Sequence, residues 1–223
     1  MKRLKAVWCM GVLVSCLGSA QFSAANDSIT RTNFEKLATF GKVAEAKQLL
    51  LQNPQLRSMP DGTGEIRLIE SAMFTAASTK GASFEFVKLM VDNGADVNAV
   101  LELTVNSRSS ALTKAISSIG LYDDPKIWGG LVRLGVVTEH TTSRQDRMAI
   151  VKYLLEEGAD PNESSVLQLS LNKGEDISKM ILEAGADLKI VNADGKTLIE
   201  TYEESIANAK SQLDLIRSIK EGK

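Results

Sequence analysis

The segment Ile150-Val-Lys-Tyr-Leu-Leu-Glu-Glu-Gly-Ala-Asp160 has a pattern that two other segments of the chain repeat, which predicts a repeat fold. These are Phe86-Val-Lys-Leu-Met-Val-Asp-Asn-Gly-Ala-Asp96 and Ile177-Ser-Lys-Met-Ile-Leu-Glu-Ala-Gly-Ala-Asp187. In each segment, apolar residues lie three, four and eight positions before the glycine, which is the spacing of one helix face. Glycine readily takes the left-handed conformation in which helices often end. The pattern therefore predicts three helices that end at the glycine, each followed by a turn that the aspartate side chain closes.

The residues around these segments extend the repeat. The stretch Gly185-Ala-Asp-Leu-Lys-Ile-Val-Asn-Ala-Asp-Gly-Lys-Thr197 and the Asn98 that follows the first Gly-Ala-Asp make the chain resemble the ankyrin repeat family. The family's Thr-Pro-Leu-His-x-Ala box is degenerate here. Its leucine position is occupied by Leu68, Leu112, Leu167 and Ile199, and an earlier unit opens at Phe34. The resemblance implies an all-α ankyrin-repeat solenoid of about five helix-turn-helix units over residues 31–222, with short or missing β-hairpin fingers.

One unit is much longer than the others. The interval from Leu112 to Gly158 far exceeds that from Leu167 to Gly185, which predicts an insertion at about residues 120–147 between the helices of the third repeat. Loops of this length inside a compact domain are often functional. Two interpretations remain open together: an interface anchored by aromatic side chains, and a short extra helix packed on the solenoid.

The segment 197–223 predicts further helix. One face is apolar and the other carries charged residues, and a solenoid needs a polar outer face on its last repeat. We therefore expect residues 197–223 to form the C-terminal capping helices. The apolar face consists of Ile199, Tyr202, Ile206, Ala209, Leu213, Ile216 and Ile219.

The N-terminus is typical of a secretory signal peptide over residues 1–25. A basic head is followed by an uncharged apolar run from position 6 to 17, and small residues allow cleavage near position 20 or 25. An alternative is the stretch Leu13-Val-Ser-Cys16, which resembles a bacterial lipobox in which Cys16 is lipidated. A cytosolic N-terminal helix is a third interpretation. We expect a periplasmic protein, or alternatively a secreted one or a lipoprotein anchored to the envelope.

Removal of this leader changes the composition of the chain. The 223 residues become 223 − 25 = 198, and the 26 basic residues become 26 − 3 = 23 against 28 acidic ones, a net charge of 23 − 28 = −5. Both cysteines lie in the leader, and the apolar run is too short to span a membrane in the mature chain. An acidic chain without a basic stripe does not favour nucleic acid as a partner.

Few residues could carry catalysis. A Ser/His/Asp hydrolase would have to use His140, the only histidine, and its polar flanks show no nucleophile elbow. The mature chain offers no cysteine for a zinc site, and the glycines at positions 62 and 64 lack the Lys-Ser/Thr of a phosphate loop. We therefore expect no enzyme activity, no cofactor and no metal.

The resemblance implies a concave surface, made by first helices and finger tips, that binds another protein. We expect a non-enzymatic protein–protein interaction module in the bacterial periplasm that scaffolds or inhibits a protein partner. An immunity protein that neutralises a periplasm-acting toxin, a lipid-anchored structural envelope protein and a hydrolase using His140 are the alternatives. The candidate partner-binding residues are Pro60, Asp61, Thr63, Leu101, Glu102, Thr104, Asn192 and Asp194 on the fingers, with Tyr122 and Trp128 in the insertion.

Overall fold

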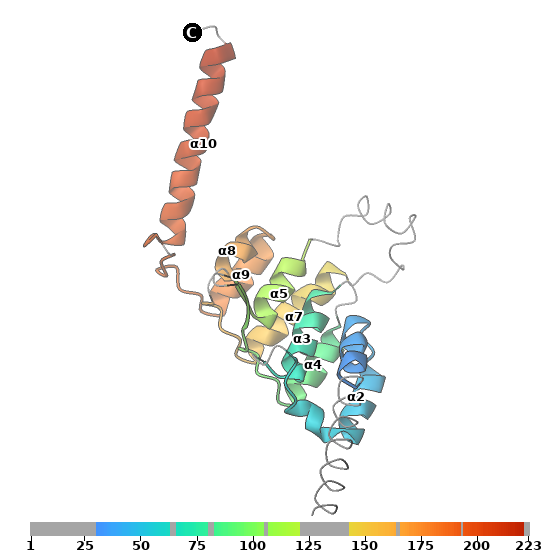
Figure 1. The fold of residues 1–223 in the computed structure, drawn as a ribbon. Coiled ribbons are helices and arrows are strands. Elements are labelled where there is room, and N and C mark those ends of the chain that lie inside the picture. Colours follow the sequence, from blue (N-terminus) through green and yellow to red (C-terminus); the bar gives the residue numbers. More distant parts are fainter. Residues whose placement is uncertain are drawn as a thin grey trace, which may run out of the picture.

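The chain folds as a stack of helix pairs followed by one long helix (Figure 1). The computed structural model describes residues 30–62, 66–79, 83–104, 107–120, 143–163, 166–192 and 194–220. The pairs are residues 30–39 with α2 (Val43–Gln52), α3 (Leu68–Ser78) with α4 (Phe84–Asp92), α5 (Ala111–Ser118) with α7 (Arg144–Glu156), and α8 (Val166–Leu171) with α9 (Glu175–Glu183). A single helix, α10 (Leu198–Lys220), follows them.

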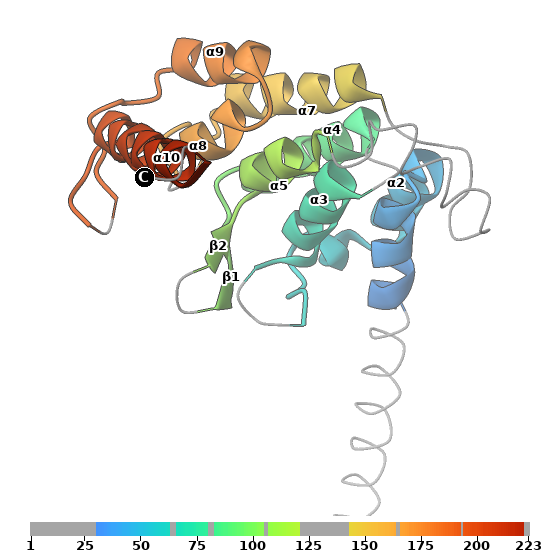
Figure 2. The ribbon, with the colours of Figure 1, turned by 90° about the horizontal axis from the view of Figure 1, so that it is seen from above.

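The pairs stack in two layers. The first helices α3, α5 and α8 contact one another in order, and the second helices α2, α4, α7 and α9 do the same. Figure 2 shows these layers side by side along the stack. The main contacts of each described pair are therefore with its neighbours in the stack, which makes the chain an all-α solenoid of the kind expected from the sequence. Its four helix pairs and single last helix correspond to the predicted five or so units.

The three repeated segments form α4, α7 and α9, as predicted. Each is followed by a glycine with positive φ: Gly94 at 89°, Gly158 at 91° and Gly185 at 98°. The aspartate two residues later closes the next turn through a side-chain acceptor. For example, the amide of Asn98 donates to Asp96 Oδ1 over 2.9 Å, and that of Asn162 donates to Asp160 Oδ1 over 2.8 Å.

The buried face of these helices differs from the predicted one at a single position. The residues eight and four before the glycine are buried as expected, but the residue three before it is only partly buried in α4 and α7. In α9 this residue, Leu182, is 40% exposed. The residue seven before the glycine, such as Val87 or Val151, is buried instead. The face is therefore rotated toward the neighbouring pair, which it must contact in a stacked array.

The fingers are short. The strands β1 (Leu101–Thr104) and β2 (Ser107–Ser109) pair antiparallel. Two other turns are held by single bridges, Pro60 with Arg67 and Val191 with Thr197. After Gly158 the chain reaches α8 at Val166 with no bridge among the described residues, so this repeat has only a short turn.

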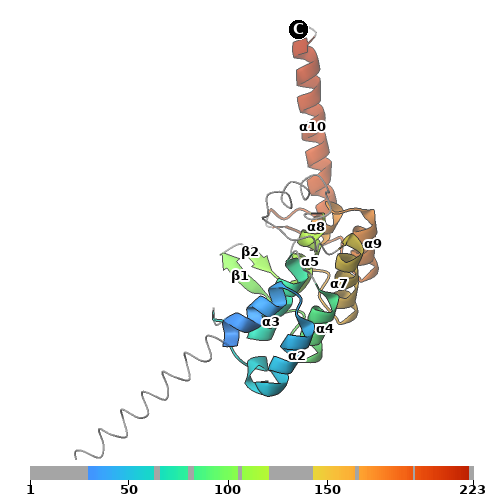
Figure 3. The same ribbon diagram turned by 90° about the vertical axis from the view of Figure 1, so that its right-hand side faces the viewer.

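The helix α10 does not form the predicted cap. It is one continuous helix of 23 residues, and none of its residues is buried. Figures 1 and 3 show it extending away from the stack instead of covering α8 and α9. The residues of its predicted apolar face do lie on a helix, but Ile206 and Ile216 on that face are 66% and 62% exposed. Amphipathicity predicts that a helix has an apolar face, and it leaves open what covers that face.

The predicted insertion falls mostly outside the described residues, which resume at position 143. The second helix of the repeat, α7, begins at Arg144, so the last predicted insertion residues belong to this helix. Ser143 caps α7 by accepting a hydrogen bond from the amide of Asp146 over 3.2 Å. Arg147 is fully buried, and its Nη2 donates to the carbonyl of Thr79 at the end of α3 over 3.1 Å.

Candidate functional site

Three turns lie along one edge of the solenoid, where the chain passes from one repeat to the next. We call their described residues together the finger surface: 60–62 with 66–67, the β1–β2 hairpin at 101–104 with 107–109, and 191–192 with 194–197. Figure 2 shows the first turn and the hairpin next to each other on the side of the first-helix layer away from the second helices. The third turn lies beyond α8, at the base of α10.

The first turn is fixed by backbone hydrogen bonds. The amide of Asp61 donates to the carbonyl of Ile66 over 3.0 Å, and the amide of Leu68 donates to the carbonyl of Met59 over 2.7 Å. Pro60 is exposed beside this ladder, and Asp61 is partly exposed. These two predicted residues therefore stand on a turn whose backbone conformation is defined by its own hydrogen bonds.

A buried carboxylate ties the first turn to the turn that follows α4. Glu70, only 3% exposed, accepts hydrogen bonds from the amide of Arg67 over 2.7 Å and from the amide of Asp96 over 3.1 Å. It also forms an ion pair with the Arg67 guanidinium. Arg67 Nη2 in turn donates to the carbonyl of Gly94 over 2.8 Å. A charge-assisted network of this kind fixes geometry as well as adding stability.

A surface pocket of about 380 Å³ lies between the first turn and the start of the hairpin. Its walls combine apolar surface with the charged groups of Arg67, Glu70 and Asp96. Such a mixed depression, placed between two fingers, suits an amphipathic side chain of a protein partner. The other lining residues are Ser58, Pro60, Ile66, Ala99 and Val100.

The hairpin places the next three predicted residues on one strand. Leu101 pairs with Ser109, Glu102 with Arg108, and Thr104 with Ser107. Leu101 is partly buried and packs against the hydrophobic core, so its side chain anchors the hairpin to the stack. The structure thus assigns Leu101 a supporting position in the finger surface.

Two asparagines that the sequence analysis did not select join successive repeats. Asn98 Nδ2 donates to the carbonyl of Gly158 over 2.9 Å, and Asn98 Oδ1 accepts from the amide of Asp160 over 2.8 Å. Asn162 Oδ1 likewise accepts from the amide of Asp187 over 2.6 Å. Both asparagines follow a Gly-Ala-Asp aspartate by two positions, and this recurrence was the signal that could have identified them.

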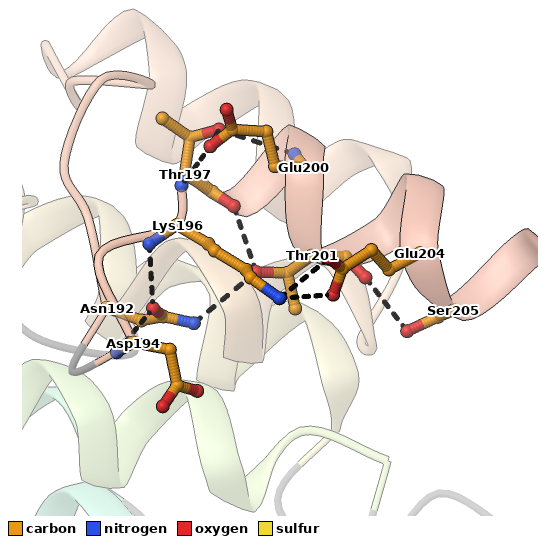
Figure 4. Close-up of polar contacts among 8 residues, drawn as sticks. All are labelled: Asn192, Asp194, Lys196, Thr197, Glu200, Thr201, Glu204 and Ser205. Atoms are coloured by element: carbon orange, nitrogen blue, oxygen red, sulfur yellow. Dashed lines mark hydrogen bonds and ion pairs between the residues drawn. The ribbon is translucent and has the colours of Figure 1, made fainter.

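The third turn is organised around Asn192 (Figure 4). Its Oδ1 accepts hydrogen bonds from the amides of Asp194 over 2.9 Å and Lys196 over 3.1 Å. The predicted residue Asn192 therefore holds the turn together. The Asp194 side chain is exposed and points away from the contacts drawn in Figure 4. Lys196 Nζ forms an ion pair with Glu204 Oε1 over 2.6 Å, which joins the turn to α10.

Two carboxyl groups near the fingers have shifted pKa values. Burial raises the pKa of Glu163, and this is opposed by a hydrogen bond from the Ser110 hydroxyl. Glu200 shows the opposite direction. The amide and the hydroxyl of Thr197, which cap the start of α10, donate to Glu200 and lower its pKa.

Several predicted residues lie outside the described part of the chain. These are Thr63 on the first turn, Tyr122 and Trp128 in the insertion, the histidine His140, and Cys16 in the leader. Pro60 lies near the start of the hairpin, since it lines the same pocket as Val100, and the turn that holds Asn192 and Asp194 lies farther along the stack, at the base of α10 (Figure 2). Among the described residues, no cluster of His, Cys, Asp or Glu could hold a metal ion, and no helix there is long and apolar enough to cross a membrane.

Comparisons with known proteins add little to this geometry. No protein-family model and no curated protein matches the sequence. Among solved structures, the chain is similar to the ankyrin repeat domain of human ASB11. The two sequences are 19% identical, the alignment covers 75% of this chain and 90% of that chain, and the TM-score is 0.26. The fold assignment therefore rests on the stacked helix pairs, the glycine-terminated second helices and the fingers described above.

Proposed function

We propose that the protein is an exported, non-enzymatic protein-interaction module of the bacterial periplasm, which scaffolds or inhibits a protein partner through its finger surface. The observation that carries this proposal is the fixed geometry of that surface. Each described turn is held by its own backbone bonds and tied to the rest of the chain through Glu70, Leu101 or Lys196. A surface ordered before binding loses less conformational entropy when a partner docks.

The chemistry of the surface supports a protein as the partner. Charged groups of both signs alternate with apolar atoms around the pocket between the first two fingers. Protein interfaces commonly combine a partly apolar centre with a mixed polar rim. Nucleic acid would require a cationic surface, whereas the chain carries 28 acidic and 26 basic residues.

The periplasmic location is proposed from the leader. The test is fractionation of a Gram-negative host that expresses the protein, followed by N-terminal sequencing of the mature chain. We expect a soluble periplasmic chain that begins near residue 21 or 26. A membrane-bound chain whose fatty-acid labelling depends on Cys16 would replace this proposal with a lipoprotein, and an uncleaved cytosolic chain would refute export.

The binding role is tested with matched charge-reversal variants. Asp194→Arg reverses a charge on the third turn of the finger surface. Glu156→Arg makes the same charge reversal on α7, in the layer of second helices. We expect a protein captured from the periplasmic fraction by the wild type to be captured by Glu156→Arg and lost or weakened with Asp194→Arg. A captured protein that is indifferent to Asp194→Arg, and likewise to Pro60→Arg, would refute binding through the finger surface.

A further inference from the structure

The helix α10 carries an exposed apolar stripe. Its 23 residues span about 35 Å at the usual helical rise, and no residue of the helix is buried. The exposed fraction is 66% at Ile206, 46% at Leu213 and 62% at Ile216. Exposed apolar surfaces of this extent mark interaction sites on soluble proteins.

The stripe has the spacing of a coiled coil. Its members are separated by alternating steps of three and four residues, which is the heptad period of helices that wind around each other. A helix that packs once against a globular core usually shows a wider stripe with a 3.6-residue period. The stripe consists of Ile199, Tyr202, Ile206, Ala209, Leu213 and Ile216.

The base of α10 directs the helix away from its own solenoid. Thr197 and Glu200 form a capping pair, Thr201 Oγ1 accepts from Asn192 Nδ2 over 3.4 Å, and the Lys196–Glu204 ion pair braces the first turns. The helix contains no glycine or proline at which it could bend back. The described repeats therefore leave the stripe uncovered, and the stripe is open to an occupant outside them.

We propose that α10 pairs with α10 of a second copy of this chain in an antiparallel coiled coil, which makes the protein a dimer. Antiparallel pairing sets Ile206 opposite Ala209 of the second copy, so a large side chain faces a small one. A parallel pair would place two Ala209 side chains together and leave a gap, which well-packed interfaces avoid. Because each solenoid joins α10 at its N-terminal end, the antiparallel pair holds the two solenoids at opposite ends.

Charge complementarity also favours the antiparallel pair. The residues that flank the stripe on one side are Glu203, Lys210 and Arg217, and in an antiparallel coiled coil this side faces itself. Glu203 of one copy then lies between Lys210 and Arg217 of the other, and the contact occurs twice. In a parallel pair the same residues would face the opposite flank, where Ser205 and Gln212 carry no charge. Flanking charges of this kind set the orientation of paired helices.

The first test measures association of the purified protein by sedimentation velocity from about 1 µM to about 1 mM. We expect a concentration-dependent dimer. Leu213→Glu, in the stripe, should raise the dissociation constant at least about tenfold, while Leu215→Glu, the same change on the other side of the helix, should leave it nearly unchanged. Far-ultraviolet circular dichroism checks that both variants keep their helix content. A monomer at all concentrations, or a dimer indifferent to Leu213→Glu, would overturn the proposal.

The second test fixes the orientation. Glu203→Arg makes the flank uniformly basic, and the double change Lys210→Glu with Arg217→Glu makes it uniformly acidic. Each variant alone should dissociate, because like charges then face each other, and mixing the two should restore a dimer containing one copy of each. If both variants dimerise alone as the wild type does, the antiparallel arrangement is overturned. If α10 instead folds onto its own last repeat, the wild type sediments as a compact monomer, and that result also overturns the proposal.

Discussion

The substitution Asn98→Ala should weaken the contact between the second and third repeats. The Asn98 side chain bridges two backbone groups that lie on the far side of the long insertion, the carbonyl of Gly158 over 2.9 Å and the amide of Asp160 over 2.8 Å. An intramolecular hydrogen bond contributes about 0.5–1.5 kcal/mol net. Because Asn98 is exposed and water can replace part of both bonds, we expect a loss of about 1–2 kcal/mol of unfolding free energy.

Urea unfolding, followed by circular dichroism and by tryptophan fluorescence, measures this loss. Stability in a repeat array depends on the contacts between neighbours, so the two transitions should also separate when this contact weakens. The control is Asn208→Ala on the exposed surface of α10, which should change the unfolding free energy by less than about 0.5 kcal/mol. An Asn98→Ala protein that unfolds at the wild-type midpoint, with coincident transitions, would refute the role of this side chain.

Three further substitutions test a helix-ending glycine, a lysine hydrogen bond between repeats and a partly buried carboxyl group. Gly158→Ala should lower the free energy of unfolding by about 1–2 kcal/mol in thermal denaturation. The cause is backbone strain alone, because φ is 91° and no atom lies within 4 Å of an added Cβ. An unchanged melting temperature would contradict this. Lys173→Met removes a donor to the carbonyl of Ile119, 2.6 Å away at the end of α5, and should lower the unfolding free energy in urea by about 1–3 kcal/mol. Burial raises the pKa of Glu163 in the folded protein above its pKa in the unfolded chain. At a pH between the two pKa values, the folded state therefore binds more protons than the unfolded state. The free energy of unfolding then falls as the pH rises from the lower pKa to the higher one. Glu163→Gln should therefore gain stability relative to wild type between pH 4 and pH 7 in urea titrations, and an equal difference at both pH values would count against the shift.

The sequence predicted the parts of the fold that depend on local patterns. The helices α4, α7 and α9 end at the expected glycines because the periodicity and the left-handed glycine are properties of the segment itself. The aspartate-closed turns are local for the same reason. The rotation of the buried face toward the residue seven before the glycine was not predicted, because it depends on where the neighbouring pair lies.

Contacts between distant segments were not predictable in the same way. Arg147 is buried against the carbonyl of Thr79, and local pattern rules favour an exposed arginine. The binding candidates Leu101 and Asn192 also support the fingers, and a finger position alone does not say which side chains hold the turn and which face outward. The apolar stripe of α10 was identified from the sequence, but its exposure beside the described repeats became visible only in the structure.

Site-specific photo-crosslinking in living cells tests the proposed binding of a protein partner by the finger surface, with the probe placed in turn at Pro60, at Asp194 and at Glu156 in the layer of second helices. We predict an adduct with a protein other than a second copy of this chain from Pro60 and Asp194 and none from Glu156. An adduct formed only from Glu156, or equally from all three positions, would refute binding through the finger surface.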